Sequence, residues 1–420
     1  MSAILRAWAA PFRIRSFRFQ WPADLATSWA FEMETLILGW YVLVETGSVE
    51  LLALFGFLIN FGTLVSPVFG AIGDRIGHRN LLCAMRAIYC VLSVGLMTLA
   101  FMGPLAPLPV FVVATVAGLV RSSDFVLRTV LIGETIPAAS LTGAMSLMRT
   151  TADSARIVGA LAGAGLVTAF GIGPAYIAIS AFYLISLVLT FGIADASPQA
   201  ASAESRAGFL TPASLWRDLA ESMVYMRARP DLLVVMFLAF LINFAAFPFV
   251  GGLLPYVAKE VYRLDQAGLG TLVASYAAGA LLGSLALSAF GAAFRPARMS
   301  VVFSVVWYGL LLIFAQLQNV VAGIVVLFLC GFVQSLCMIM ISVAMLRGAD
   351  PQFRGRVMSM RTLAVYGLPL GLLAAGLLID HLGFTTTATL YCGLGVVVTL
   401  LVALRWRAHL WRTESPANAR

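Results

Sequence analysis

Three groups of ionisable side chains lie inside long apolar stretches of this 420-residue chain. They are Asp24, Glu32 and Glu34; Arg121, Asp124 and Arg128; Arg149, Asp153 and Arg156. A charge at such a position in a membrane costs several kcal/mol, so it is a candidate for substrate or proton handling by default. All three groups lie in the N-terminal half, whereas the C-terminal half has no comparable set of charges and offers Asn243, Gln334 and Tyr276 instead. We therefore expect the N-terminal half to handle charge or protons, with Asp24, Glu32, Glu34, Arg121, Asp124 and Arg156 as the proton-coupling or cavity candidates.

The spacing of the second and third groups refines their roles. Each is an arginine–aspartate–arginine triplet whose intervals of three and four residues place it on one face of a helix. Arg121 and Arg156 are expected near the middle of the membrane, and Arg128 and Arg149 toward the cytoplasm. For Arg128, Arg149 and Asp153 we favour a structural ion-pair network that holds a cytoplasmic gate.

Glu32 and Glu34 are two residues apart, which separates them by about 200° on a helical wheel. One of them can line a cavity while the other meets a neighbouring helix. Desolvation favours the protonated form of a carboxyl group, so a proton-coupled step could use either residue. The sequence does not say which of the two titrates.

The composition places the chain in a bilayer. Hydrophobic residues make up 61% of the chain and charged residues 11%, and the mean hydropathy is +0.96. A soluble surface needs about a quarter of its residues charged. The net charge of +8 comes from basic residues scattered at the ends of apolar runs, with no aromatic-interleaved basic patch, which argues against nucleic-acid binding.

Twelve apolar runs of membrane-spanning length predict an all-α membrane protein with twelve transmembrane helices. The runs lie at roughly 19–44, 51–71, 80–102, 108–130, 144–170, 172–194, 231–257, 266–292, 299–316, 320–346, 357–379 and 384–404. Basic residues collect in alternate loops and in both terminal segments, and the positive-inside rule then places both termini in the cytoplasm. The location expected from this is a prokaryotic inner membrane.

A polar segment divides the chain into two halves. Residues 195–230 are small and polar at first and then form an amphipathic pattern, which predicts a mobile cytoplasmic linker with a short surface helix. The expected domains are a six-helix bundle over 1–194, this linker, a second six-helix bundle over 231–405 and a cytoplasmic tail over 406–420.

The seventh run carries helix-breaking residues in the middle of an apolar segment. They are Asn243, Pro248, Gly251 and Gly252. A broken helix is tolerated in lipid where its freed carbonyl groups face protein or a water-filled cavity. Two interpretations remain open, namely a gating or substrate-lining hinge and a kink that improves packing.

A compact glycine-rich turn, residues 70–79, separates the second and third runs. It contains Gly70, Gly73, Asp74, Arg75, Gly77 and Arg79. Glycines allow close backbone approach and turn dihedrals closed to other residues. The turn resembles the G-x-x-x-D-R-x-G-x-R signature between the second and third helices of the major facilitator superfamily.

A narrower resemblance runs from about residue 18 to residue 405. Residues 34–43 look like the first helix of the superfamily branch that contains the enterobactin exporter and macrolide efflux proteins. Residues 124–128 with Glu134 resemble the segment of that branch after its fourth helix, residues 354–357 the segment before its eleventh helix, and residues 369–371 a part of that helix. The branch implies a central cavity between the halves, alternating access and export driven by proton entry.

The same resemblance implies a cytoplasmic gate. Asp74 and Arg75 would latch the turn of the first half, and Arg354 and Arg356 would serve the corresponding turn of the second. The fifth run departs from drug antiporters, because it keeps Gly159 and lacks the proline that usually follows such a glycine.

These observations predict a proton-coupled efflux transporter for a small organic molecule, such as a siderophore-like metabolite or a drug. The expected partners are this molecule, protons and the bilayer; the chain is expected to be a monomer with no cofactor, metal or enzymatic activity. Neither a catalytic constellation nor a phosphate-binding Gly-Lys-Ser/Thr loop occurs in the sequence. The alternatives are uptake or flipping of an amphipathic lipid and, in another class, a non-transporting membrane sensor or scaffold.

Overall fold

The computed structural model describes residues 10–62, 69, 72–73, 76–194, 229–290, 295–349 and 364–407. The described chain is helical and contains no strand. The predicted linker helix, the tail beyond residue 407 and the gate residues Gly70, Asp74, Arg75, Arg354 and Arg356 lie outside the described residues.

The first half is a bundle of six long helices that follow a short 3₁₀ turn, η1 (Ala10–Arg13). Its members are α2 (Arg15–Thr46), α3 (Val49–Phe61), α5 (His78–Met102), α6 (Pro107–Thr135), α7 (Ala138–Phe170) and α8 (Ile172–Thr190). Tight turns join them: Gly47 ends α2 with φ of +62°, and the Ser48 side chain caps α3 by accepting from the Leu51 backbone N–H.

The second half repeats this arrangement, but its first helix is broken. The broken segment is α10 (Pro230–Ala245), α11 (Phe247–Gly251), α12 (Leu254–Tyr256) and a π-helical turn, η3 (Val257–Val261). The others are α13 (Gln266–Phe290), α14 (Pro296–Gln316), α15 (Val320–Gly348), α17 (Gly367–Leu382) and α18 (Phe384–Arg405).

Eight of the described helices are long and apolar enough to cross a membrane, and residues 49–61, 232–245 and 367–382 form shorter apolar helices. The number twelve and the side of the membrane on which the termini lie stay predictions. We call the end of the bundle at which α2 begins and α18 ends the near end, and the opposite one the far end.

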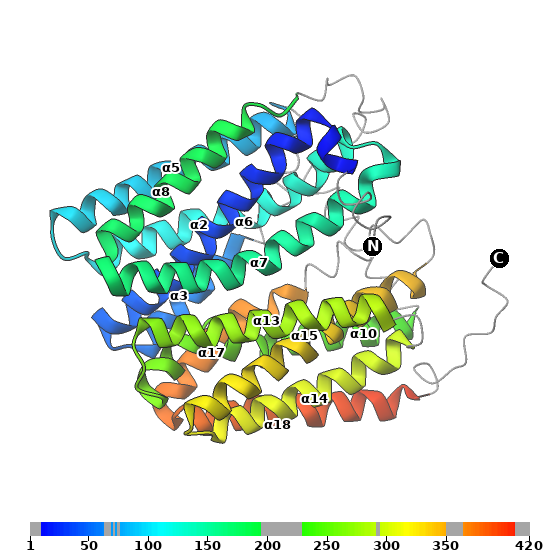
Figure 1. The fold of residues 1–420 in the computed structure, drawn as a ribbon. Coiled ribbons are helices and arrows are strands. Elements are labelled where there is room, and N and C mark those ends of the chain that lie inside the picture. The colour runs from blue at the N-terminus through cyan, green and yellow to red at the C-terminus, as the bar shows by residue number, and fades with distance from the viewer. Residues whose placement is uncertain are drawn as a thin grey trace.

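The two halves pack against each other through α7 with α13 and α3 with α17, and they converge toward the far end (Figure 1). Small residues allow this approach: a Cβ atom on Gly270 of α13 would lie 2.6 Å from the Ala164 Cβ of α7, and one on Gly376 of α17 would lie 2.5 Å from the Ala53 Cβ of α3. At the far end of α2, the Lys259 Nζ donates to the Leu43 carbonyl oxygen at 3.3 Å. The nine charges that the sequence singles out lie on α2, α6 and α7 of the first half.

Candidate functional site

Four buried charges join α2, α5 and α6 inside the first half, and we call them the sealed cluster. Asp24 pairs with Arg86, Arg128 pairs with Asp124, and the Arg128 Nε lies 3.5 Å from the Asp24 Oδ1. None of the four side chains is more than 8% exposed. Two carboxylates and two guanidinium groups cancel, as buried charges must if they are to be tolerated.

Polar neighbours complete the sealed cluster. The Arg128 Nη1 donates to the Ser28 Oγ at 3.1 Å, and the Gln20 Nε2 donates to the Arg128 carbonyl oxygen at 3.0 Å. Arg86 also donates to the hydroxyl of Thr190 on α8. The cluster therefore ties four helices of one half together, which is a structural arrangement.

Arg86 is the site residue that sequence reasoning missed. It lies in the third apolar run, at residues 80–102, and its side chain is fully buried. The rule that selected the other nine charges applies to it equally, so a charge inside an apolar run was the available signal.

A second group, which we call the open cluster, joins α2, α6 and α7. The Glu32 Oε1 lies 3.8 Å from the Arg121 Nη2 and 3.7 Å from the Arg156 Nε. The side chains of Glu32, Arg121 and Arg156 are 22%, 35% and 44% exposed. One carboxylate between two arginines leaves a net charge of +1. These distances define ion pairs that are longer than hydrogen bonds, so the carboxylate holds both arginines loosely.

Glycines bring α2 and α7 together at the open cluster. A Cβ atom on Gly159 would lie 2.7 Å from the Glu32 Cβ, and one on Gly163 would lie 3.1 Å from the Met33 Cα. The guanidinium carbon of Arg121 lies 3.5 Å from the centre of the Phe31 ring. The close approach of α2 and α7 therefore sets the position of the Glu32 backbone relative to Arg121 and Arg156.

Glu32 faces the second half. It shares one helical stripe with Leu36, Gly39 and Leu43, at intervals of four, three and four residues. Leu36 and Leu43 belong to a core that is built mainly from the second half, and Gly39 lies against Pro255. Glu32 is the member of this stripe closest to the near end.

Arg156 faces the second half as well. It precedes Ala160 and Ala164 at intervals of four residues, and these two alanines contact Gly270 of α13. Tyr276 lies six residues further along α13. The buried Tyr276 hydroxyl has no hydrogen-bond partner in the described part of the chain. The open cluster thus lies beside the interface between the halves.

Glu34 points to a different neighbour. Its Oε2 accepts a hydrogen bond from the Tyr183 hydroxyl at 2.9 Å and its Oε1 one from the Tyr176 hydroxyl at 3.4 Å, both from α8. The side chain is buried inside the first half, and the Tyr183 ring stacks on that of Tyr89. No described basic side chain forms an ion pair with Glu34.

The predicted gate network is divided in the structure. The Arg149 Nε lies 3.3 Å from the Asp153 Oδ2 on the same helix, with Arg149 60% exposed and Asp153 buried. Arg128 is held instead by Asp24 and Asp124, because α2 brings the Asp24 carboxylate beside α6. Arg128 therefore belongs to the sealed cluster, and a gate role for Arg128, Arg149 and Asp153 stays a prediction.

The described part of the glycine-rich turn lies at the near end of the first half. Gly77 precedes α5 with φ of +89°, a region that glycine favours. The Arg79 Nη2 donates to the Phe191 carbonyl oxygen at 2.9 Å, and a Cβ atom on Gly73 would lie 2.9 Å from the His78 ring. The turn is packed against its own half by these contacts.

The seventh run is broken where it meets α17. Asn243 donates to the Ala239 carbonyl oxygen at 2.9 Å within α10, and Pro248 and Gly252 lie against residues 371 and 372. A Cβ atom on Gly371 would lie 2.2 Å from the Phe244 carbonyl oxygen. Gly251 is exposed with open space beside it. The break allows close packing on α17, and a hinge role stays a prediction.

The comparisons with known proteins agree with this fold. A model of the Major Facilitator Superfamily matches residues 25–368, and a second match covers residues 236–419. The chain therefore belongs to the major facilitator superfamily. It is a multi-pass membrane protein and a secondary transporter for small molecules, and it is not an enzyme.

Solved structures with the same fold include a POT family transporter, PepTSo (TM-score 0.74, 14% identity, covering 95% of this chain and 99% of that one). The human organic anion transporter MFSD10 (TETRAN) has a TM-score of 0.67 and 16% identity, covering 92% and 99%. A D-xylose-proton symporter has a TM-score of 0.68 and 12% identity, covering 91% and 95%. A search of curated proteins found no match. At these identities the structures show the fold alone.

Proposed function

We propose that this chain couples proton movement to the export of a small organic molecule by alternating access, with Glu32 as the proton-binding residue. The observation that carries the proposal is the open cluster. Glu32 is a partly exposed carboxylate in the middle of a helix, it faces the second half, and it bridges arginines from two other helices. A carboxylate in that position can be reached by protons and can change the packing of the helices around it.

The open cluster has two protonation states with different consequences. A charged Glu32 attracts Arg121 on α6 and Arg156 on α7, which draws three helices together. A protonated Glu32 has lost both ion pairs and leaves two arginines repelling each other in a weakly polar space. Because α7 packs on α13 of the second half, a change in its position reaches the interface along which the halves move.

The other carboxylates are less suited to this task. Asp24 and Asp124 are each held by a buried arginine, and removing their charge would leave that arginine uncompensated. Glu34 is buried with two tyrosine hydroxyls inside one half.

The proposed orientation places the near end in the cytoplasm of a prokaryotic cell, as the distribution of basic residues predicts. The contacts described between Gly39 and Pro255 and between Leu43 and Lys259 then close the outer face. In this orientation the structure represents a state closed to the outside. We propose that the glycine-rich turn, with Gly73, Gly77 and Arg79, closes the cytoplasmic side in the alternate state.

One observation favours a second candidate, namely uptake of an amphipathic organic anion together with a proton. The net charge of the open cluster is +1, and protonation of Glu32 raises it to +2. An anion bound between Arg121 and Arg156 and a proton on Glu32 would each strengthen the binding of the other. If the anion and the proton bind at the same time, they cross the membrane in the same direction. Export of the anion against proton entry requires that the two bind alternately.

The direction of transport can be measured before the substrate is known. Cells with and without the protein are compared by untargeted mass spectrometry of cytosol and medium. The export proposal expects a compound that moves to the medium with the wild-type protein and not with Glu32→Gln. The matched control is Glu45→Gln, which makes the same change at an exposed position on α2 and is expected to behave as wild type. A compound that accumulates inside the cell instead supports the second candidate, and no movement of any soluble compound overturns both.

Once the compound is identified, the coupling between its transport and proton movement is measured in vesicles. The vesicles have the cytoplasmic side of the protein outward and an acidic interior. In exchange, adding the compound outside releases protons from the vesicle, so the pH gradient falls as the compound enters. In cotransport, vesicles that are loaded with the compound and have no imposed pH gradient release protons together with the compound. We expect Glu32→Gln to abolish the proton flux in either case while binding of the compound persists. An unchanged proton flux in Glu32→Gln would assign the proton to another residue.

A further inference from the structure

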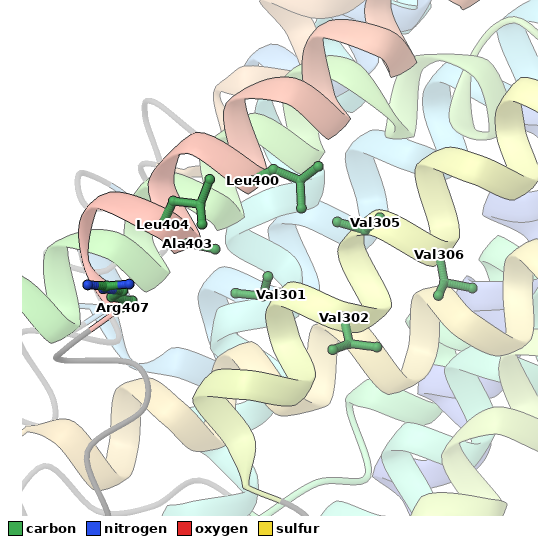
Figure 2. A pocket seen from close by; sticks show the side chains of 8 residues that line it. All are labelled: Val301, Val302, Val305, Val306, Leu400, Ala403, Leu404 and Arg407. Carbon is green, nitrogen blue, oxygen red and sulfur yellow. The ribbon is translucent and has the colours of Figure 1, made fainter.

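A groove runs along the outer surface of the second half between α14 and α18. It has a volume of about 730 Å³ and is lined by seven aliphatic side chains and one arginine. Figure 2 shows Arg407 at one end of the groove, beyond Leu404, and the aliphatic side chains along the two helices away from it. The lining residues are Val301, Val302, Val305, Val306, Leu400, Ala403, Leu404 and Arg407.

The charged end of the groove lies at the level of the membrane surface. Arg407 follows the last turn of α18, and α14 begins at Pro296 after its N-cap residue Arg295. Trp406 and Ala297 both pack against a cluster that contains Val301 and Ala403, and the Arg405 guanidinium lies 5.4 Å from the Trp406 ring centre. Tryptophan and arginine at helix ends are typical of the boundary between hydrocarbon and headgroups.

The charged residues of the two helices that line the groove have one sign. Arg405 and Arg407 lie at the end of α18, and Arg295 and Arg298 at the start of α14. Neither helix contains an acidic residue. A basic site at headgroup level between transmembrane helices is complementary to an anionic lipid headgroup.

The apolar part of the groove can hold the upper two-thirds or so of a lipid tail. From Arg407 to Leu400 the groove follows seven residues of helix, or about 10 Å. One leaflet of the hydrocarbon core is about 15 Å deep. Val302, Val306, Leu400 and Leu404 are 43–67% exposed, so an occupant would contact them directly.

We propose that this groove binds an anionic phospholipid, with the phosphate at Arg407 and one acyl chain along the valines and leucines. Arginine holds phosphate through two parallel hydrogen bonds, and it does so with any phospholipid. The surrounding arginines add the preference for a headgroup with net negative charge. The site is separate from the open cluster, which lies in the other half, and it does not depend on what the protein transports.

The test uses the full-length protein in vesicles of mixed phosphatidylglycerol and phosphatidylcholine. One of the two lipids at a time carries a photoactivatable diazirine in its acyl chain, and cross-linked peptides are identified by mass spectrometry. We expect labelling within residues 301–306 and 400–404, with phosphatidylglycerol labelling them at least about fivefold more than phosphatidylcholine at equal amounts, which corresponds to one arginine near an anionic surface.

Two variants and a control locate the interaction. Arg407→Gln is expected to lower phosphatidylglycerol labelling of these peptides toward the level of phosphatidylcholine. Val302→Trp fills the groove and is expected to remove labelling by both lipids. The control is Arg263→Gln, at an exposed arginine that follows η3 at the far end of the bundle. It removes one positive charge away from the groove and is expected to leave the labelling unchanged.

Three results would overturn the proposal. They are equal labelling by the two lipids in the wild-type protein, labelling that Arg407→Gln does not change, and cross-linking of the groove to a second copy of the chain in place of lipid.

Discussion

The sealed cluster and the open cluster both pair carboxylates with arginines in the same half of the molecule. They even share two helices, because α2 supplies Asp24 to one and Glu32 to the other, and α6 supplies Arg128 and Arg121 in the same way. The sealed cluster has balanced charges, buried side chains and polar neighbours, whereas the open cluster has an excess arginine, longer ion pairs and exposure toward the second half. The exposure and the net charge of a cluster therefore distinguish charges that stabilise the fold from charges that are available to a ligand.

The largest effect is expected from breaking the sealed cluster. Arg86→Met leaves two buried carboxylates with a single arginine, and removing one partner of a buried ion pair typically costs about 3–5 kcal/mol. We expect a large fall in the yield of folded protein and in its apparent melting temperature in detergent. The double variant Asp24→Asn with Arg86→Met restores the charge balance and should recover at least half of the loss. Equal instability of the single and double variants would contradict the charge-balance interpretation.

Substitutions of Glu34 test whether a buried carboxyl group without an ion pair contributes to stability as the sealed cluster does. Glu34→Leu strands the hydroxyl groups of Tyr176 and Tyr183, and a buried unsatisfied polar group costs about 1–3 kcal/mol. Glu34→Gln keeps one acceptor and should lose less stability than Glu34→Leu, while proton flux in vesicles should persist. Loss of proton flux in Glu34→Gln, with Glu32→Gln unaffected, would reverse the assignment of the proton site.

The open cluster is expected to matter for transport more than for stability. Glu32→Gln and Arg156→Gln remove ion pairs between partly exposed groups, whose contribution after solvent screening is about 1 kcal/mol or less. The melting temperatures should therefore stay close to that of the wild type while proton-coupled transport fails. A stability loss as large as that of Arg86→Met would make the open cluster a structural element.

The smallest effect is expected at the ion pair between Arg149, which is 60% exposed, and the buried Asp153. Arg149→Gln breaks an ion pair between residues one helical turn apart, which is worth about 0.3–0.5 kcal/mol where solvent surrounds the arginine, as it does here. The melting temperature should not change measurably, and high salt should produce the same result in the wild-type protein. A clear loss of transport with normal stability would support the predicted role of Arg149 at the cytoplasmic gate.

Much of the architecture follows from the sequence because the bilayer restricts the choice. Uninterrupted apolar runs of about 20 residues can only be helices, since every backbone polar group must be satisfied within the segment. Gly77 in a short turn and the helix-breaking residues of 243–252 likewise mark positions at which the chain turns or breaks. These are local properties, and neighbouring residues suffice to predict them.

The sequence by itself determined which charges lie in apolar runs, and only the tertiary structure decided their partners. The i, i+3, i+7 spacing places Arg121, Asp124 and Arg128 on one face of α6, yet seven residues span about 10 Å, so the ends of that face meet different helices. Asp24 pairs with an arginine 62 positions away, and Glu32 and Glu34 differ in their partners because α7 lies on one side of α2 and α8 on the other. Pairing depends on which helices are adjacent, and helix adjacency is set by packing of the whole bundle.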